Sequence, residues 1–139
     1  MRLVFLIAKT VHGALYRLSG GRLGSHVAGL PVLLLTTTGR KTGKPRTVPL
    51  SYYEDGDALV VVGSKGGAPR HPAWYLNLEA NPEVEIQVFD EVLPAVARTT
   101  IGEERERLWA LMRQTWPAYD EYQTRTDREI PVVVLTPKD

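Results

Sequence analysis

Two short loops carry the residues best suited to bind an anionic small molecule. The first, residues 39–46, places four cations around two glycines with no acid nearby: Arg40, Lys41, Lys44 and Arg46. The second, residues 64–71, reads Ser-Lys-Gly-Gly-Ala-Pro-Arg-His. Lysine and arginine neutralise phosphate and carboxylate groups, and glycine lets backbone N–H groups turn toward such a group. We therefore expect one phosphorylated small molecule to bind between the two loops.

Charge is distributed unevenly along the chain. All 16 acidic residues lie at or after Glu54, whereas residues 1–53 carry roughly half of the 17 lysines and arginines. Such an asymmetry indicates an anionic partner for the basic half: a phosphorylated ligand, a membrane surface or a nucleic acid. No nucleic acid is expected, because the basic stretch lacks interleaved exposed aromatic residues.

The composition argues against several kinds of chemistry. The chain has no cysteine, which removes disulfides, thiolate catalysis and cysteine-bound metals. The three histidines, at positions 12, 26 and 71, are too widely spaced for a compact metal centre. No apolar run approaches the ~20 residues of a membrane-spanning helix, and the start of the chain is a poor signal peptide because Lys9 interrupts it. These features favour a cytoplasmic protein that binds no metal.

The hydrophobic pattern predicts a helix followed by one α+β domain. Apolar residues recur at helical spacing over residues 2–18, opposite basic ones, so residues 1–20 are expected to form an amphipathic helix. This helix either packs on the domain or lies on the anionic inner face of the cell membrane. The domain, residues 31–139, is predicted to be a small β-barrel with helices packed around it.

About six strands, mostly antiparallel, are expected in this domain. They are residues 32–38, 46–53, 58–63, 83–89, 92–99 and 130–136. One helix is expected over residues 71–81, and another runs to about Gln114 from a capping box of Thr100 and Glu103. A further helical turn should begin at Pro117.

Three other features could belong to a site. Ser64 lacks a suitable histidine and acid for a serine hydrolase, so its expected role is that of a hydrogen-bond donor. Trp74 and Tyr75 follow the second loop and serve either as core residues or as the wall of a pocket for a flat ring. The third feature is a set of aromatic residues that recur at a spacing of three: Trp116, Tyr119 and Tyr122. Their rings either pack on the barrel or line a pocket.

These segments together resemble the deazaflavin-dependent nitroreductase family, the A-type flavin and deazaflavin oxidoreductases. The resemblance rests on GRKTGKPRTVPL (39–50), SKGGAPRHPAWYLNLEANP (64–82) and WPAYDEYQTRTDREIPVVVL (116–135), and it extends over residues 31–137. It implies a split β-barrel and an oxidoreductase that uses coenzyme F420, a phosphorylated deazaflavin with an anionic oligoglutamate tail. Such a cofactor would match the two basic loops.

The resemblance also implies roles for individual residues. Residues implied to bind the phosphate and tail are Arg40, Lys41, Thr42 and Arg46. Val48 and Pro49 would line the ring. Contacts to the lactyl-phosphate end or the ring edge would come from Ser64, Lys65 and Gly66, and the other side would be closed by Ala73, Trp74, Tyr75 and Asn77. The candidates for polarising or protonating the acceptor are Ser64 and Tyr119, with Trp116, Tyr119 and Tyr122 as the substrate-binding residues.

The implied reaction is hydride transfer from reduced F420 to a quinone, an enone or a nitroaromatic compound, all small planar acceptors. Some family members carry tyrosine where this chain has Trp116. Nitroimidazole reduction is therefore the least expected of these activities. Two alternatives stay open: an FMN-binding reductase on the same barrel, and a non-catalytic module that sequesters the cofactor or a lipid. The resemblance also implies a homodimer and, in some members, membrane association.

Overall fold

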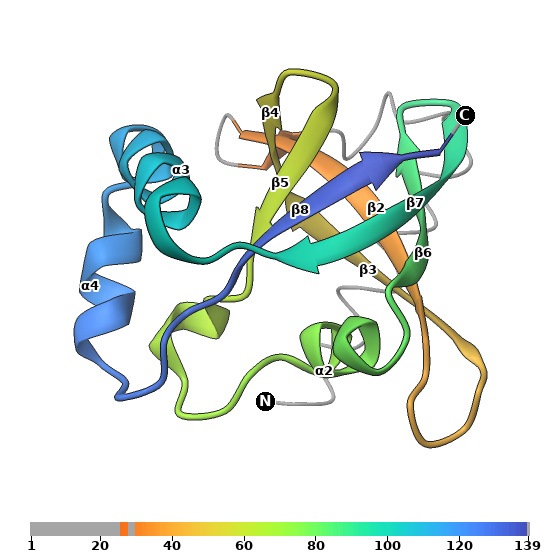
Figure 1. The fold of residues 1–139 in the computed structure, drawn as a ribbon, viewed down its shortest axis with the longest axis horizontal. Coiled ribbons are helices and arrows are strands. Elements are labelled where there is room, and N and C mark those ends of the chain that lie inside the picture. Colours follow the sequence, from red (N-terminus) through yellow and green to blue (C-terminus); the bar gives the residue numbers. More distant parts are fainter. Residues whose placement is uncertain (1–25, 28–29, 139) are drawn as a thin grey trace.

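The computed structural model describes residues 26–27 and 30–138, and the expected helix over residues 2–18 lies outside them. The strands are β1 (His26–Val27), β2 (Leu30–Thr38), β3 (Pro45–Ser51), β4 (Tyr53–Asp55), β5 (Ala58–Val62), β6 (Glu83–Val88), β7 (Glu91–Thr99) and β8 (Val132–Pro137). The helices are η1 (Lys65–Gly67, a 3-10 turn), α2 (Ala73–Ala80), α3 (Gly102–Thr115) and α4 (Ala118–Thr124) (Figure 1).

The connectivity of the strands closes the sheet into a barrel. The strand order is β1-β2-β6-β7-β8-β5-β4, with β3 also paired to β2, and every pair is antiparallel. Only Tyr52 separates β3, at one edge, from β4, at the other. The two edges are therefore joined through one residue, and the N–H of Tyr52, which donates to the Pro31 carbonyl at 3.1 Å, extends the β2–β3 pairing up to that junction. This confirms the α+β split barrel.

The described part of the chain contains eight strands, which include the six that were expected. The two additional strands, β1 and β4, have two and three residues. Such short segments contain too few residues to show an alternating pattern. Proline within a strand is confined to edges and bulges, and Pro49 accordingly lies in β3, which is at an edge and paired only with β2.

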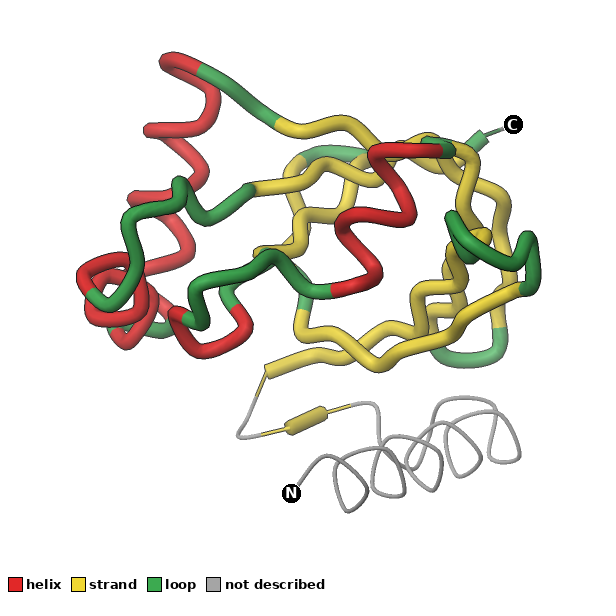
Figure 2. Tube along the Cα trace, turned by 90° about the horizontal axis from the view of Figure 1, so that it is seen from below, coloured by secondary structure: helices red, strands yellow, loops and turns green. Residues whose placement is uncertain are grey.

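The sheet separates two apolar cores because successive side chains of a strand point to opposite faces. Val61, Val133 and Leu135 face the barrel interior, where Trp74, Tyr75 and Leu78 of α2 join them. On the outer face, residues of α3, α4 and the adjacent loop pack on the neighbouring strand residues: Leu108, Met112, Tyr119 and Ile130 on Val60, Val62, Val132 and Val134. In Figures 1 and 2, α3 and α4 accordingly lie together on one side of the molecule, apart from α2.

The predicted capping box at the start of α3 is wrong. Ile101 is the N-cap residue, and no side chain caps the helix. Thr100 is buried, and its N–H and its hydroxyl both donate to the Val132 carbonyl at 2.9 Å. Its hydroxyl thus joins the end of β7 to β8, because a buried polar group needs a partner, and it does not reach the helix.

Candidate functional site

The first basic loop is closed by its own backbone. The N–H of Gly39 donates to the Lys44 carbonyl at 2.8 Å, and the N–H of Gly43 donates to the Gly39 carbonyl at 2.7 Å. Gly43 has a φ of 72°, a left-handed conformation that glycine adopts without strain. The four cations, Arg40, Lys41, Lys44 and Arg46, are exposed, and none forms an ion pair within the described residues. The loop therefore presents charge that the described part of the protein does not neutralise.

Asn77 of α2 attaches this loop to the barrel. Its side-chain oxygen accepts from the Arg40 backbone N–H at 3.1 Å and from Arg40 Nη1 at 3.0 Å. Its side-chain nitrogen donates to the Thr37 hydroxyl at 3.2 Å. Asn77 is only 4% exposed, and its amide oxygen is engaged within the protein. Its observed contribution to the site is to hold Arg40 in position.

The backbone of the second loop has an unusual left-handed conformation and packs closely against neighbouring residues. Lys65, Gly66 and Gly67 all have positive φ, at 46°, 63° and 82°. A Cβ built on Gly67 would lie 2.5 Å from the Tyr122 carbonyl oxygen of α4, so the loop approaches α4 more closely than any side chain permits. Ser64 is half-buried, and its hydroxyl forms no hydrogen bond with a described residue, so it is available to a ligand.

Arg128, which the sequence reasoning missed, holds this loop from outside. Its Nε donates to the Ala68 carbonyl at 2.8 Å, its Nη1 to the Gly63 carbonyl at 3.0 Å and its Nη2 to the Ser64 carbonyl at 2.8 Å. Nη1 also lies 3.0 Å from Nδ1 of His71. No local pattern marks this arginine, because its partners lie 57 to 65 residues earlier in the chain.

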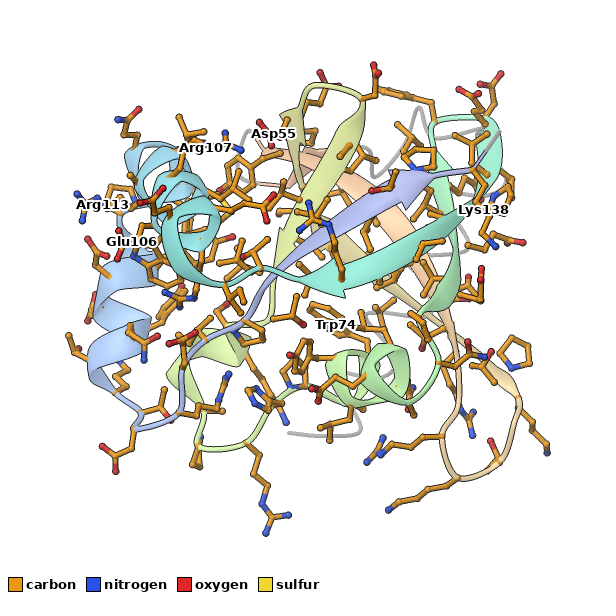
Figure 3. The ribbon with its side chains drawn as sticks, viewed as in Figure 1. Asp55, Trp74, Glu106, Arg107, Arg113 and Lys138 are labelled. Carbon is orange, nitrogen blue, oxygen red and sulfur yellow. The ribbon has the colours of Figure 1, made fainter. Side chains whose placement is uncertain are left out.

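Helix α2 lies between the two basic loops (Figure 1). It begins at Ala73, two residues later than expected, and Asn77 lies roughly 6 Å further along its axis at 1.5 Å per residue. Trp74 and Tyr75 are 8% and 5% exposed and belong to the barrel core, and Figure 3 shows Trp74 between α2 and the sheet. The Tyr75 hydroxyl bonds the Thr99 hydroxyl at 2.8 Å. The two rings anchor α2, which leaves exposed Ala73 as its accessible first residue.

Val48 and Pro49 point to opposite faces of β3. Val48 packs against the interior core, and the register pairs it with Leu35 of that core. Pro49 pairs with Leu34 and faces outward. The side chains of both residues therefore cannot line one face of the same ring. Arg46 shares the inward face with Val48 and lies at the end of β3 that joins the first loop.

The aromatic group is assembled as a cluster on the outer face of the sheet. Trp116 Nε1 donates to the Tyr122 hydroxyl at 3.4 Å, and the Tyr119 and Tyr122 rings meet edge to face at 6.1 Å. Tyr119 is only 8% exposed. Burial, followed by the nearby Tyr53 phenol, raises the pKa of the Tyr119 hydroxyl far above its usual value, so this hydroxyl keeps its proton at neutral pH.

The predicted site residues thus fall into two groups. The second loop touches the aromatic cluster directly, since Gly67 abuts the Tyr122 carbonyl and Arg125 Nη1 donates to the Gly66 carbonyl at 3.4 Å. The first loop instead contacts α2 through Asn77. Because α2 follows the second loop along the chain, it links the two groups.

The donor set suits a large, multiply anionic cofactor, since unpaired cations lie on both sides of α2. The family model described as F420H(2)-dependent quinone reductase matches residues 8–137. The chain belongs to this family. Membership confirms the expected oxidoreductase class and the deazaflavin F420 as its cofactor.

Relatives of known sequence or structure agree with this assignment. An F420H(2)-dependent quinone reductase of Mycobacterium tuberculosis is 48% identical over 130 residues, which cover 91% of this chain and 87% of the relative. The solved structure of an F420-H2 dependent reductase, FDR-A, is 52% identical over 76% of this chain and 93% of that chain, with a TM-score of 0.69. A solved chain described as a domain-swapped dimer is 43% identical, covers 97% of this chain and 99% of that chain, and has a TM-score of 0.72.

Among the described residues, no helix is both long enough and apolar enough to cross a bilayer.

Proposed function

We propose that this protein reduces a quinone with a hydride taken from reduced F420. The observation that carries the proposal is the pair of basic loops with unpaired cations on either side of α2, in a chain whose family is the F420H(2)-dependent quinone reductases. The reduced deazaflavin supplies the hydride, and the protein supplies binding, orientation and electrostatics.

The first loop is proposed to bind the anionic part of the cofactor. Lys41 and Arg46 are exposed and unpaired, and Arg40 is positioned by Asn77. Thr42 accepts the N–H of Lys44 at 3.2 Å, which leaves its own hydroxyl hydrogen to donate. Charge-assisted hydrogen bonds of this kind are stronger than neutral ones, so this loop would provide much of the affinity.

The second loop and the start of α2 are proposed to bind the rest of the cofactor. Lys65 is exposed, and the turn at Gly66 brings the backbone close to a ligand. The N–H groups of Ala73 and Trp74, in the first turn of α2, have no backbone partner among the described residues, and the helix dipole favours negative charge there. Tyr75 and Asn77 would act by holding α2 and Arg40 in place. Of Val48 and Pro49, Val48 is the one that faces inward, so it is the one proposed to line the ring.

The acceptor is proposed to bind beside the second loop, next to Ser64 and the aromatic cluster. A hydride brings two electrons and one hydrogen to the quinone, and the resulting oxyanion needs one further proton. The unengaged Ser64 hydroxyl can donate a hydrogen bond to that oxygen. Tyr119 keeps its proton because burial raises its pKa, so its hydroxyl can donate a hydrogen bond to the same oxygen. It is the second candidate for polarising or protonating the acceptor, with Trp116 and Tyr122 as flat walls beside it.

The proposal extends to the oligomeric state, a membrane surface and further acceptors. A homodimer is supported by the solved relative described as a domain-swapped dimer. Attachment to an anionic membrane surface through residues 2–18 rests on the absence of acidic residues before Glu54, and it would place a cytoplasmic protein at the inner face of the cell membrane. Enones and nitroaromatic compounds are further acceptors of similar planar shape, and Trp116 makes nitroimidazoles the weakest candidates.

The decisive experiment combines binding and turnover. The purified protein is titrated with F420 and with FMN, followed by fluorescence, and the reduced form of each cofactor is then mixed with a quinone. We expect tight binding of F420, weaker binding of FMN, and quinone-dependent oxidation of reduced F420. FMN binding equal to or tighter than F420 binding would refute the cofactor assignment. F420 binding without turnover on quinones, enones or nitroaromatics would favour the sequestering module.

The role of Ser64 is tested by Ser64→Ala, with Arg113→Lys as the control. Arg113 lies on α3, where its side chain pairs with Asp120 at 3.7 Å, away from both loops. We expect Ser64→Ala to lower quinone turnover about 10- to 100-fold, the loss expected when one donor to a developing oxyanion is removed. Cofactor affinity should change much less. Equal turnover in both variants would remove Ser64 from the reaction.

A further inference from the structure

Arg128 uses four of the five N–H donors of its guanidinium on one loop. Three go to the backbone carbonyls of Gly63, Ser64 and Ala68, and the fourth goes to His71 Nδ1. Because these three carbonyls all accept from the same guanidinium, the loop from residue 63 to residue 68 curves around a single cation. The left-handed turn at residues 65–67 lies within this curve.

The contact with His71 has a consequence for its protonation. A guanidinium has only donors, so Nδ1 of His71 must be an acceptor and carry no proton. Protonation would end this hydrogen bond and set two cations 3.0 Å apart. Burial and the charge of Arg128 lower the pKa of His71, and Glu79 of α2 acts in the opposite direction with a smaller effect.

Other neighbours fix the histidine ring in this position. His71 stacks on Tyr75 of α2 with 4.8 Å between ring centroids, tilted by 57°. Tyr75 is itself held by Thr99 of β7. The ring therefore cannot move away from Arg128 without disturbing the core residue on which it packs.

We propose that Arg128 is the residue that positions the Ser64–Gly67 loop for the cofactor and acceptor, and that it does so only while His71 Nδ1 is unprotonated. The proposal rests on the proposed function, because that loop matters for binding only if it contacts F420. It assigns Arg128 no contact with the reacting atoms. It also predicts that acid releases the loop, which couples cofactor affinity to the proton concentration.

The first test needs no cofactor. The chain has three histidines, so an NMR titration of the imidazole signals can resolve His71, which His71→Asn assigns by loss of its peak. We expect the pKa of His71 to rise toward its ordinary value in Arg128→Gln and to stay unchanged in the control Arg113→Gln. An identical His71 titration in the wild type and Arg128→Gln overturns the proposal, whatever the protein binds.

The second test measures oxidised F420 binding between pH 5 and 8. Arg128→Lys keeps the charge but cannot reach all four acceptors, so we expect its affinity at pH 7.5 to fall roughly 10- to 100-fold, the effect of losing hydrogen bonds to a charged group. Arg113→Lys should bind like the wild type. Wild-type binding should weaken as His71 becomes protonated, whereas His71→Asn, which keeps an acceptor and cannot titrate, should bind equally well across the range.

Two outcomes of the second test contradict the proposal. One is an Arg128→Lys affinity equal to that of the wild type. The other is an affinity loss that follows a loss of folding, seen as a melting temperature well below that of Arg113→Lys. If the wild type itself fails to bind F420, the proposed function fails, and the NMR titration still decides whether Arg128 and His71 are coupled.

Discussion

The two basic loops have similar composition but are held in place by different means. The first is closed by hydrogen bonds between its own residues and touches the rest of the described protein through Arg40 and Asn77. The second takes its shape from Arg128, about 60 residues later in the chain, and from close contact with α4. The cations of the first loop are exposed and can contact a ligand. The second loop is held in shape by Arg128, a cation that lies outside it.

The largest expected effect comes from adding one methyl group to a glycine in each loop. Gly67→Ala puts a Cβ 2.5 Å from the Tyr122 carbonyl at a φ of 82°, so we expect a loss of about 2–5 kcal/mol of unfolding free energy, from left-handed strain and overpacking. Gly43→Ala, at a φ of 72° with nothing within 4 Å, should lose only about 1–2 kcal/mol. Urea denaturation measures both, and equal losses would mean that the contact with α4 is unimportant.

The second prediction concerns the cations of the first loop. Lys41→Ala and Arg46→Ala should each weaken F420 binding about 10- to 100-fold at low salt, the usual range for a hydrogen bond to a charged group. The loss should shrink at high salt, because screening weakens the wild-type contact too. Fluorescence titration at two salt concentrations measures this effect. Affinities that are independent of salt and unchanged in both variants would exclude an anion site in this loop.

The third prediction concerns the aromatic cluster that packs against the second loop. Tyr119→Phe should keep cofactor affinity and slow turnover about 10- to 100-fold, at the low end of what a positioned acid contributes. Trp116→Tyr should change the ratio of nitroimidazole to quinone reduction. Steady-state kinetics on the two acceptors is run beside a thermal melt. A lower melting temperature with unchanged ratios would show that the rings serve only to pack α4 on the barrel.

The fourth prediction is the pH dependence of stability in the second loop. The pKa of His71 is lowered in the folded state from an ordinary value of 6.5. The unfolded chain therefore binds the proton more tightly, so the contribution of His71 is complete above that value and is lost as the pH falls through the folded-state pKa. Thermal melts should show a greater loss on acidification in the wild type than in His71→Asn. Equal losses of melting temperature on acidification in the two proteins would contradict the contribution of His71 to stability.

The smallest expected effect comes from an arginine that binds a carboxylate at the surface. Arg107 of α3 donates two bonds to Asp55 of β4, at 3.0 and 2.9 Å, and Figure 3 labels both residues. Surface pairs contribute little, so Arg107→Gln should barely change the melting temperature at neutral pH. The pair lowers the pKa of Asp55, so any difference from the wild type should vanish as the pH falls through that pKa. A marked fall in melting temperature at neutral pH would contradict the small contribution expected of this surface pair.

Much of this protein could be predicted from local sequence. Short apolar and β-branched runs between turn residues, one of them with clean alternation, identified the six long strands. The cations of the first loop were identified because four of them lie within seven residues. The family was identified from three continuous motifs, and family membership is confirmed. These features share one physical property: each depends on residues close together in the chain, where spacing alone determines which side chains share a face.

Tertiary structure decided the rest. Thr100 looked like a helix cap until the approach of β8 offered its hydroxyl the Val132 carbonyl. Trp74 and Tyr75 were equally suited to a pocket wall until closure of the barrel placed them inside it. Arg128 resembled any surface arginine, yet it meets carbonyls that only the completed fold brings within reach. A buried donor or acceptor must be paired, and the chain alone does not show which distant group will be there to pair with it.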